Sequence, residues 1–425
     1  MKMAKIALKS VTLQGKNAEI RQKDILIEGN RFVRICESLA PQDLDGAEVV
    51  DCSRFAVLPA FYNGHTHAAM TLLRGYADDM PLQKWLQEYI WPFEAKLCGD
   101  DIEIACRLAV LEMIKSGTVF FADMYWHRER TIKVVEEMGI RASVGVTFAE
   151  SLMPPEAIEK NFEFLAAHTG ESERVRLAVA PHSVYTVGEK LLKRCADFAR
   201  VEGFGVHIHL SETRQELEDC EKQYGCSPVA LLERAGMLDS NLVAAHCVHL
   251  SDGDLKALVD SGTTAVLNPC SNLKLASGIP PIDRLLRAGA KMALGTDGAS
   301  SNNNLDMHEE MKLAALLAKV QGGAETLPAA DVLDMATVNA ARAYGIVDAG
   351  EIREGALADC LLVRLDDERM TPCHDLVSNW VYAADSSCID SVICNGRFVM
   401  RGRHVDGEEE IKEAARACAK RLANS

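Results

Sequence analysis

Short apolar segments alternate with helical segments through the middle of this chain, and this alternation limits the possible fold more than any other feature. Helical stretches such as Asp101–Ser116 and Glu189–Glu202 separate most of the apolar runs. Eight βα units are the number that closes a parallel (β/α)8 barrel. A doubly wound open sheet is the alternative, but no GxGxxG turn follows the first run to favour it. The eight runs are Phe55–Thr66, Val119–Met124, Ala142–Thr147, Arg176–Ser183, Gly205–Leu210, Leu242–His249, Thr263–Pro269 and Lys291–Asp297.

Both ends of the chain have the pattern of small β structures. Asp24–Ile35 and Ser391–Met400 each read as two strands around a tight turn, and Glu408–Ala423 reads as an amphipathic helix. Because chain termini often lie close together, we expect the two ends to combine. The fold class is therefore α/β, a TIM-like (β/α)8 barrel over residues 59–349 with a small β-sandwich domain formed by residues 1–58 and 350–425.

The composition excludes several classes of partner. The chain has 425 residues, of which 48% are hydrophobic, and its formal net charge is −16. An acidic balance argues against nucleic acid or an anionic membrane as the main partner, because both require clustered Lys and Arg. No charge-free apolar run is long enough to span a bilayer, and the first residues lack the apolar core of a signal peptide. With 14 scattered Cys read as reduced thiols, we expect a cytoplasmic protein.

Histidines and an aspartate fall where the predicted strands end, on the face where such barrels build their sites. His65 and His67 end the first strand, and side chains two apart share one face. The fifth strand carries His207 and His209; His209 is the better ligand, whereas His207 lies deeper and reads as a hydrogen-bonded core residue. Asp297 follows the eighth strand, where alone it would read as a helix N-cap. Together His65, His67, His209 and Asp297 predict a metal site suited to Zn²⁺ or Fe²⁺.

Two more polar residues lie at the same predicted barrel mouth. His246 follows the apolar run of the sixth strand, and Glu212 lies three residues beyond His209. A loop glutamate alone is usually solvated, but this one has a reason to face inward. The end of the fourth strand reads Ala180–Ser183 and contains no lysine that could bridge a second ion, so the sequence indicates a single metal.

With these residues the chain resembles the amidohydrolase superfamily, and within it the branch of S-adenosylhomocysteine/methylthioadenosine deaminases and triazine hydrolases. The resemblance implies one divalent metal, Zn²⁺ before Fe²⁺, and hydrolytic deamination of an adenine nucleoside or similar amino-heterocycle with release of ammonia. Relatives often form homo-oligomers, but no interface can be read from this sequence, so the oligomeric state stays open. The matching stretches span nearly the whole chain and are LPAFYNGHTHAAMTLLRGYADDMPLQKWL, WPFEAKL, SGTVFFADMY, PHSVYT, HIHLSET, AAHCVHL, NPCSNLKLASG and GTDGASSNNNLDM.

The resemblance also implies roles for individual residues. Asp297 takes a proton from the attacking water, His246 orients the resulting hydroxide, and Glu212 contacts the substrate and protonates its ring nitrogen. Glu94 matches a family glutamate that binds ribose hydroxyls, and His182 matches a histidine that meets the nucleoside. Without the family, Glu94 would read as a helix-surface charge and His182 as a capped loop residue.

Alternatives remain within and outside this branch. The same site could serve a guanine-, pterin- or triazine-type deaminase or a chlorohydrolase, whereas a catalytically silent scaffold would lack ligands that this chain has. Relatives that accept S-adenosylhomocysteine present arginines on and after the third strand. Here no arginine follows Arg141 until Arg174, and Arg141 is expected to precede that strand. We therefore expect a weaker preference for S-adenosylhomocysteine than for methylthioadenosine, adenosine or another amino-heterocycle.

Overall fold

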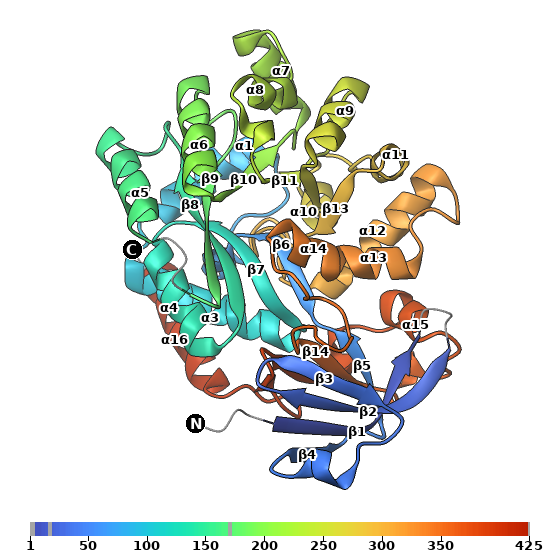
Figure 1. Ribbon diagram of the computed structural model, residues 1–425. Coiled ribbons are helices and arrows are strands. Elements are labelled where there is room, and N and C mark those ends of the chain that lie inside the picture. The colour runs from blue at the N-terminus through green and yellow to red at the C-terminus, as the bar shows by residue number, and fades with distance from the viewer. Residues whose placement is uncertain (1–4, 16–18, 169–171, 424–425) are drawn as a thin grey trace.

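A parallel sheet of eight strands, arranged in chain order, forms the centre of the molecule (Figure 1). The computed structural model describes residues 5–15, 19–168 and 172–423. All seven later strands begin and end within three residues of the predicted runs, and all are largely buried. The strands are β6 (Phe61–Thr66), β7 (Thr118–Tyr125), β8 (Arg141–Phe148), β9 (Val175–Pro181), β10 (Gly205–Leu210), β11 (Leu242–His246), β12 (Thr264–Leu267) and β13 (Lys291–Leu294).

The first and last of these strands meet through the residues that follow β13. The amide of Asp297 donates to the carbonyl oxygen of His65 over 3.0 Å. Asn63 Nδ2 donates to Thr296 Oγ1 over 2.7 Å, and the amide of Thr296 donates back to Asn63 Oδ1 over 3.1 Å. These bonds close the sheet on itself, and the predicted TIM-like barrel is confirmed.

Helices surround the barrel because each presents an apolar stripe to it. Helix α6 shows the pattern, since it buries Leu192, Cys195 and Ala199 and ends at Gly203 with a positive φ of 78°. The surrounding helices are α3 (Gly99–Lys115), α4 (Arg128–Met138), α5 (Pro155–Ala167), α6 (Glu189–Glu202), α7 (Arg214–Tyr224), α8 (Pro228–Arg234), α9 (Asp252–Ser261), α10 (Pro269–Lys274), α11 (Ile282–Ala288), α12 (Met307–Gly322), α13 (Ala329–Ala336) and α14 (Val338–Ala343). No helix in the described ranges is both long and apolar enough to cross a membrane.

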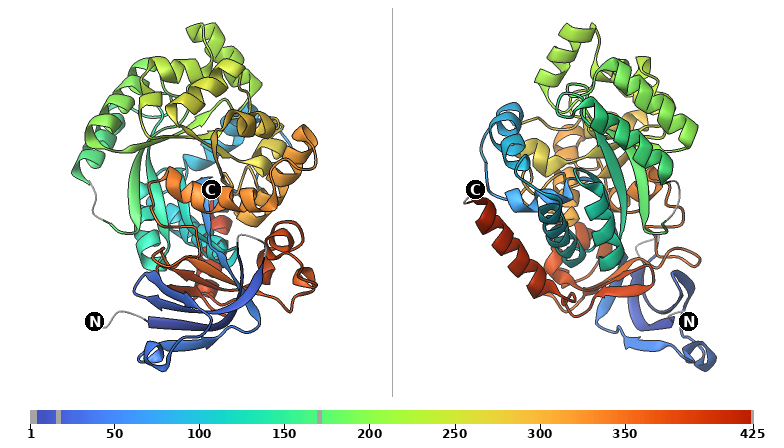
Figure 2. Two further views of the ribbon diagram at one scale, coloured as in Figure 1. Left: turned by 45° about the vertical axis from the view of Figure 1, so that its right-hand side comes forward. Right: turned by 90° about the vertical axis from the view of Figure 1, so that its left-hand side faces the viewer.

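The two chain ends meet in a second, mixed sheet at the opposite end of the molecule from the barrel mouth (Figures 1 and 2). The prediction that both ends form one β domain is confirmed, whereas its boundaries at 58 and 350 stay a prediction. Residues 1–4, 16–18 and 424–425 of the predicted domain lie outside the described residues. Its strands are β1 (Lys5–Gln14), β2 (Ile20–Glu28), β3 (Arg31–Cys36), β4 (Glu48–Asp51), β5 (Phe55–Pro59), β14 (Cys360–Arg364), β15 (Ile389–Cys394) and β16 (Arg397–Met400).

Two helices belong to the C-terminal segment. Helix α15 (Leu376–Tyr382) follows β14, and α16 (Glu408–Ala423) has the bounds predicted from the sequence. Figure 2 shows α16 running along the outside of the barrel, where Arg421 donates a hydrogen bond to Asp101 of α3.

The apolar run Phe55–Thr66, predicted as one strand, is two strands in different sheets. β5 pairs antiparallel with β14 and parallel with β1 in the end sheet, whereas β6 pairs with β7 in the barrel. The break falls after Pro59, which has no backbone N–H to donate to a ladder. The strands on both sides of the break are largely buried, so the pattern alone did not reveal it.

Arg141 begins β8, and the expectation that it precedes this strand was wrong. Its guanidinium forms an ion pair with Asp359 and donates to Asn395 Oδ1 over 2.7 Å. The side chains of Arg141 and Asp359 are 5% and 0% exposed. Because Arg141 lies at the amino end of the strand, it joins the barrel to the end sheet and is remote from the barrel mouth.

Candidate metal centre and active site

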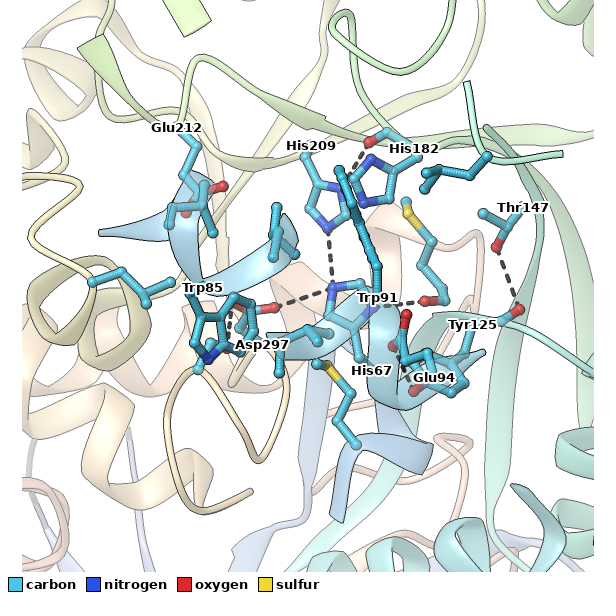
Figure 3. Close-up of a pocket in the computed structure, with 18 of the residues that line it drawn as sticks. His67, Trp85, Trp91, Glu94, Tyr125, Thr147, His182, His209, Glu212 and Asp297 are labelled. Atoms are coloured by element: carbon cyan, nitrogen blue, oxygen red, sulfur yellow. Dashed lines mark hydrogen bonds and ion pairs between the residues drawn. The ribbon is translucent and has the colours of Figure 1, made fainter. Parts of the chain in front are cut away.

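The structure brings the four predicted metal ligands together at the carboxyl ends of the barrel strands, and Figure 3 shows His67, His209 and Asp297 among them. His67 Nε2 lies 3.1 Å from His209 Nε2 and 3.3 Å from Asp297 Oδ1. His65 Nε2 also lies 3.3 Å from Asp297 Oδ1. His246 joins them, because one ligand atom each from His65, His209, His246 and Asp297 lie within 4.8 Å of one another.

The outer nitrogens of the three predicted imidazole ligands are all hydrogen-bonded. His67 Nδ1 lies 2.6 Å from the carbonyl oxygen of Met124, and His209 Nδ1 lies 2.7 Å from that of His182. His65 Nδ1 lies 3.0 Å from His207 Nε2. Metal-binding histidines have this arrangement, in which one nitrogen is held from behind and the other faces the ion. The buried Nε2 of His65 has no hydrogen bond within the described residues, and this donor set fits Zn²⁺ or Fe²⁺.

Asp297 is oriented by two serines. Its Oδ2 accepts hydrogen bonds from Ser271 Oγ over 2.6 Å and Ser301 Oγ over 2.8 Å, which leaves Oδ1 facing the histidines. Burial opposes ionisation of this carboxyl, but the close contacts with His65 and His67 and the charges of His67 and His246 outweigh it and hold the pKa of Asp297 well below its usual value. Asp297 is therefore a carboxylate at neutral pH.

Four residues at the rim have left-handed backbone conformations. The φ values are 51° for Ser211, 73° for His246, 50° for Cys247 and 59° for Asp297. Such values are uncommon outside glycine and cost on the order of 1 kcal/mol or more each, so they persist where the surroundings enforce them. They mark the points at which the chain turns out of β10, β11 and β13, and strain of this kind gathers at functional sites.

Glu212 is a buried acid beside the histidine cluster. Its Oε2 lies 3.8 Å from His246 Nε2, and its Oε1 accepts a hydrogen bond from Ser277 Oγ over 3.1 Å. Burial, together with the charge of Asp297, raises the pKa of Glu212 to about 8. Burial also lowers the pKa of His246 to about 4. At neutral pH the site therefore combines a protonated glutamic acid, a neutral imidazole and an ionised aspartate.

The pocket in front of this cluster is closed by a helical segment made of α1 (Leu82–Trp85), a π-helical turn η3 (Leu86–Ile90) and α2 (Trp91–Glu94). Trp85 and Trp91 both line the pocket, and the lining residues include no lysine or arginine among those described. Glu94, at the end of α2, accepts from Tyr125 Oη over 2.6 Å and from Trp126 Nε1 over 3.4 Å. Burial raises the pKa of Glu94.

His182 lies on the same pocket wall, after β9. Its Nδ1 lies 3.1 Å from both Ser183 Oγ and Thr186 Oγ1, and its ring centroid is 4.7 Å from that of His209 in an edge-on arrangement. His182, Glu94, Glu212, His246 and Asp297 thus line one pocket.

Several residues that support the site had no role assigned from the sequence. Ser271 and Ser301 orient Asp297, and Asn272 Nδ2 lies 2.9 Å from His246 Nδ1. All three lie in the segments NPCSNLKLASG and GTDGASSNNNLDM after the seventh and eighth strands. Serine and asparagine are common in loops, so their position next to strand ends was the only indication available.

Comparisons with known proteins agree with this geometry. The model of the amidohydrolase family matches residues 56–399. The 5-methylthioadenosine/S-adenosylhomocysteine deaminase of Pelotomaculum thermopropionicum is 43% identical over 424 residues, covering 97% of each chain. The 5'-deoxyadenosine deaminase of Methanothermobacter thermautotrophicus is 43% identical over 399 residues, covering 93% of this chain and 92% of that protein.

Among solved structures, an adenosine deaminase from Xanthomonas campestris with bound zinc has a TM-score of 0.92 and 32% sequence identity. The similarity covers 100% of this chain and 99% of that one. Both the family match and these relatives extend over most of the chain. The chain therefore belongs to the amidohydrolase family.

Proposed function

We propose that this chain is a metal-dependent deaminase that hydrolyses the exocyclic C–N bond of an adenine nucleoside and releases ammonia. The observation that carries the proposal is the pairing of a buried acid with a pKa of about 8, Glu212, and the ionised Asp297 beside a cluster of imidazoles. Deamination requires both a proton donor and a proton acceptor at one carbon, and this pocket offers them with opposite protonation states. The named activities of the relatives support the same reaction.

In this proposal His65, His67, His209 and Asp297 hold one divalent ion, Zn²⁺ before Fe²⁺. The bound zinc of the Xanthomonas campestris neighbour supports this choice. His246 is assigned as a hydrogen-bond donor instead of a ligand, because the amide nitrogen of Asn272 can only donate to His246 Nδ1. The neutral ring then carries its proton on Nε2, facing the pocket.

The ion, when bound, supplies a hydroxide nucleophile near neutral pH by lowering the pKa of water. Asp297 accepts the proton that water loses, and His246 Nε2–H orients the nucleophile toward the ring carbon that bears the amino group. Glu212 donates its proton to the adjacent ring nitrogen as the new C–O bond forms. Transfer of the proton held by Asp297 to the amino group lets the C–N bond break and ammonia leave. The new hydroxyl group loses its proton as the carbonyl forms, and that proton restores the acid form of Glu212, so one water is consumed and both carboxyl groups are regenerated.

Substrate preference follows from the other wall of the pocket. Glu94 is proposed to accept hydrogen bonds from the ribose hydroxyls, and His182 to contact the nucleoside. Among the residues that the structure describes, the lining contains no lysine or arginine that could pair with an amino-acid carboxylate. We therefore expect methylthioadenosine, 5'-deoxyadenosine and adenosine to be better substrates than S-adenosylhomocysteine.

The test is a measurement of ammonia release by the zinc-loaded protein from these four nucleosides, guanine, a pterin and an amino-triazine, with chloride release from a chlorotriazine. We expect the highest kcat/KM with an uncharged adenine nucleoside. Release of chloride from the chlorotriazine would support the alternative chlorohydrolase reaction. Release of ammonia from guanine or the amino-triazine alone, and not from the adenine nucleosides, would support the alternative deaminase reactions. A preference for S-adenosylhomocysteine would refute the substrate assignment.

A cytoplasmic location also stays a prediction, and homo-oligomeric assembly stays open.

A further inference from the structure

His207 lies one layer below the predicted metal ligands, inside the barrel. It precedes His209 by two residues on β10, shares its face, and is 1% exposed. Its ring meets His65 edge-on, with centroids 5.0 Å apart, and Tyr344 on another side at 6.0 Å. His207 does not line the pocket, so it does not touch the proposed substrate, and its ring is hydrogen-bonded to the outer nitrogen of His65 and not to the cluster of ligand atoms.

The two nitrogens of His207 have very different surroundings. Nε2 lies 3.0 Å from His65 Nδ1, whereas Nδ1 is buried and has no hydrogen-bond partner within the described residues. A histidine that binds a metal through Nε2 must carry its proton on Nδ1. His65 Nδ1–H then donates to His207 Nε2, and His207 must carry its own proton on the unpartnered Nδ1.

An enclosed N–H without an acceptor destabilises a folded protein, and most buried polar groups avoid this state. An apolar side chain of similar size would fill the same space without that penalty. The hydrogen bond to His65 therefore explains a histidine at this position, whereas packing alone does not.

His65 differs in this respect from the other two imidazoles. His67 and His209 are held at Nδ1 by backbone carbonyl oxygens, which are present whatever the side chains are. His65 alone among the three depends on a side chain. Without that acceptor, its proton would move to Nε2 and face Asp297 Oδ1, which is 3.3 Å away. In that tautomer, His65 Nε2 has no lone pair for an ion, and its N–H donates a hydrogen bond to the carboxylate oxygen of Asp297.

We propose that His207 is a positioning residue for the metal: it accepts the Nδ1 proton of His65 and so keeps the Nε2 lone pair of His65 directed at the ion. The proposal rests on His65 being a metal ligand in the proposed function.

The experiment compares His207→Gln with His207→Asn in the metal-free full-length protein, titrated with Zn²⁺ alone against a chromophoric chelator. A glutamine oxygen can occupy the place of histidine Nε2, whereas the shorter asparagine reaches only the place of Nδ1. We expect His207→Asn to weaken zinc binding about 10- to 100-fold, the usual effect of losing an outer-shell partner. His207→Gln should retain most of the affinity. Equal affinities of the two variants would overturn the proposal.

Two leucine variants separate this role from a merely structural one. His207→Leu removes the unpartnered N–H, so the metal-free protein should melt no lower than the parent while zinc binding weakens. His308→Leu is the matched control, because His308 is also buried but its ring Nε2 donates to the carbonyl oxygen of Trp380, away from the metal ligands. It should lower the melting temperature and leave zinc affinity unchanged. A lower melting temperature for His207→Leu with unchanged zinc affinity would refute the positioning role. Failure of the parent to bind zinc would instead refute the metal site itself, and this inference with it.

Discussion

Glu212→Gln tests the acid that the mechanism requires. With a pKa of about 8, Glu212 is protonated in about nine of ten molecules at pH 7, against a few in a thousand for an ordinary glutamate. Burial therefore increases the available acid by roughly several hundredfold. Glutamine has the same shape but cannot transfer a proton, so kcat should fall about 10²- to 10⁴-fold, or about 3–5 kcal/mol in activation free energy.

The assay is the pH dependence of kcat/KM for adenosine, followed by the absorbance change on conversion to inosine, at equal metal content. The acid form exists below its raised pKa, so the activity of the parent should be constant near neutrality and fall as pH rises through about 8. Glu212→Gln should lack this alkaline decline. Activity within tenfold of the parent, or the same decline in the variant, would refute the assignment of Glu212 as the acid.

Ser277→Ala is the matched control for that profile. The hydroxyl of Ser277 donates to Glu212 Oε1 and lowers its pKa, in opposition to burial. Its removal should move the alkaline decline to higher pH while the acid itself remains. A shift to lower pH would contradict the electrostatic account of this pair.

Three further predictions concern the ribose contact, the metal and the domain junction. Glu94→Gln should lower kcat/KM for adenosine about 10- to 100-fold, with a much smaller effect on a substrate without ribose hydroxyls; equal losses would exclude a ribose contact. Asp297→Asn should abolish activity and reduce the zinc content of the purified protein, measured by metal analysis. Arg141→Met should lower the free energy of unfolding in urea by about 3–5 kcal/mol, because it leaves the buried charge of Asp359 without its cation. Adding Asp359→Leu should recover most of that loss of unfolding free energy. No recovery would show that the loss comes from the side-chain packing of Arg141 and not from the buried charge of Asp359.

The barrel and the positions of its histidines could be predicted because both depend on short stretches of chain. Eight apolar runs separated by helices indicate a closed parallel sheet, and the alternation of side chains along a strand puts His65 and His67 on one face. Parallel strands deliver their carboxyl ends to one edge, so His209 and Asp297 were expected near them. The structure has all four together.

Other features depend on contacts between residues far apart in the sequence. Arg141 and Asp359 are 218 positions apart, and nothing near Arg141 indicates that it serves the junction of the two domains. The break at Pro59 likewise depends on β14, some 300 residues further along the chain. The serines that orient Asp297 and the histidine behind His65 became visible only in the folded chain.

The protonation state of Glu212 shows most clearly what the tertiary structure decides. The sequence gives a glutamate three residues after His209, and its residue type alone would make it ionised at neutral pH. Burial and the nearby charge of Asp297 reverse that state by raising its pKa to about 8. Periodicity is a local property of the chain, so the sequence determines the fold class and the strand ends where chemistry can occur. Desolvation and long-range pairing exist only once the chain has closed, and they determine whether each group is an acid, a base or a ligand.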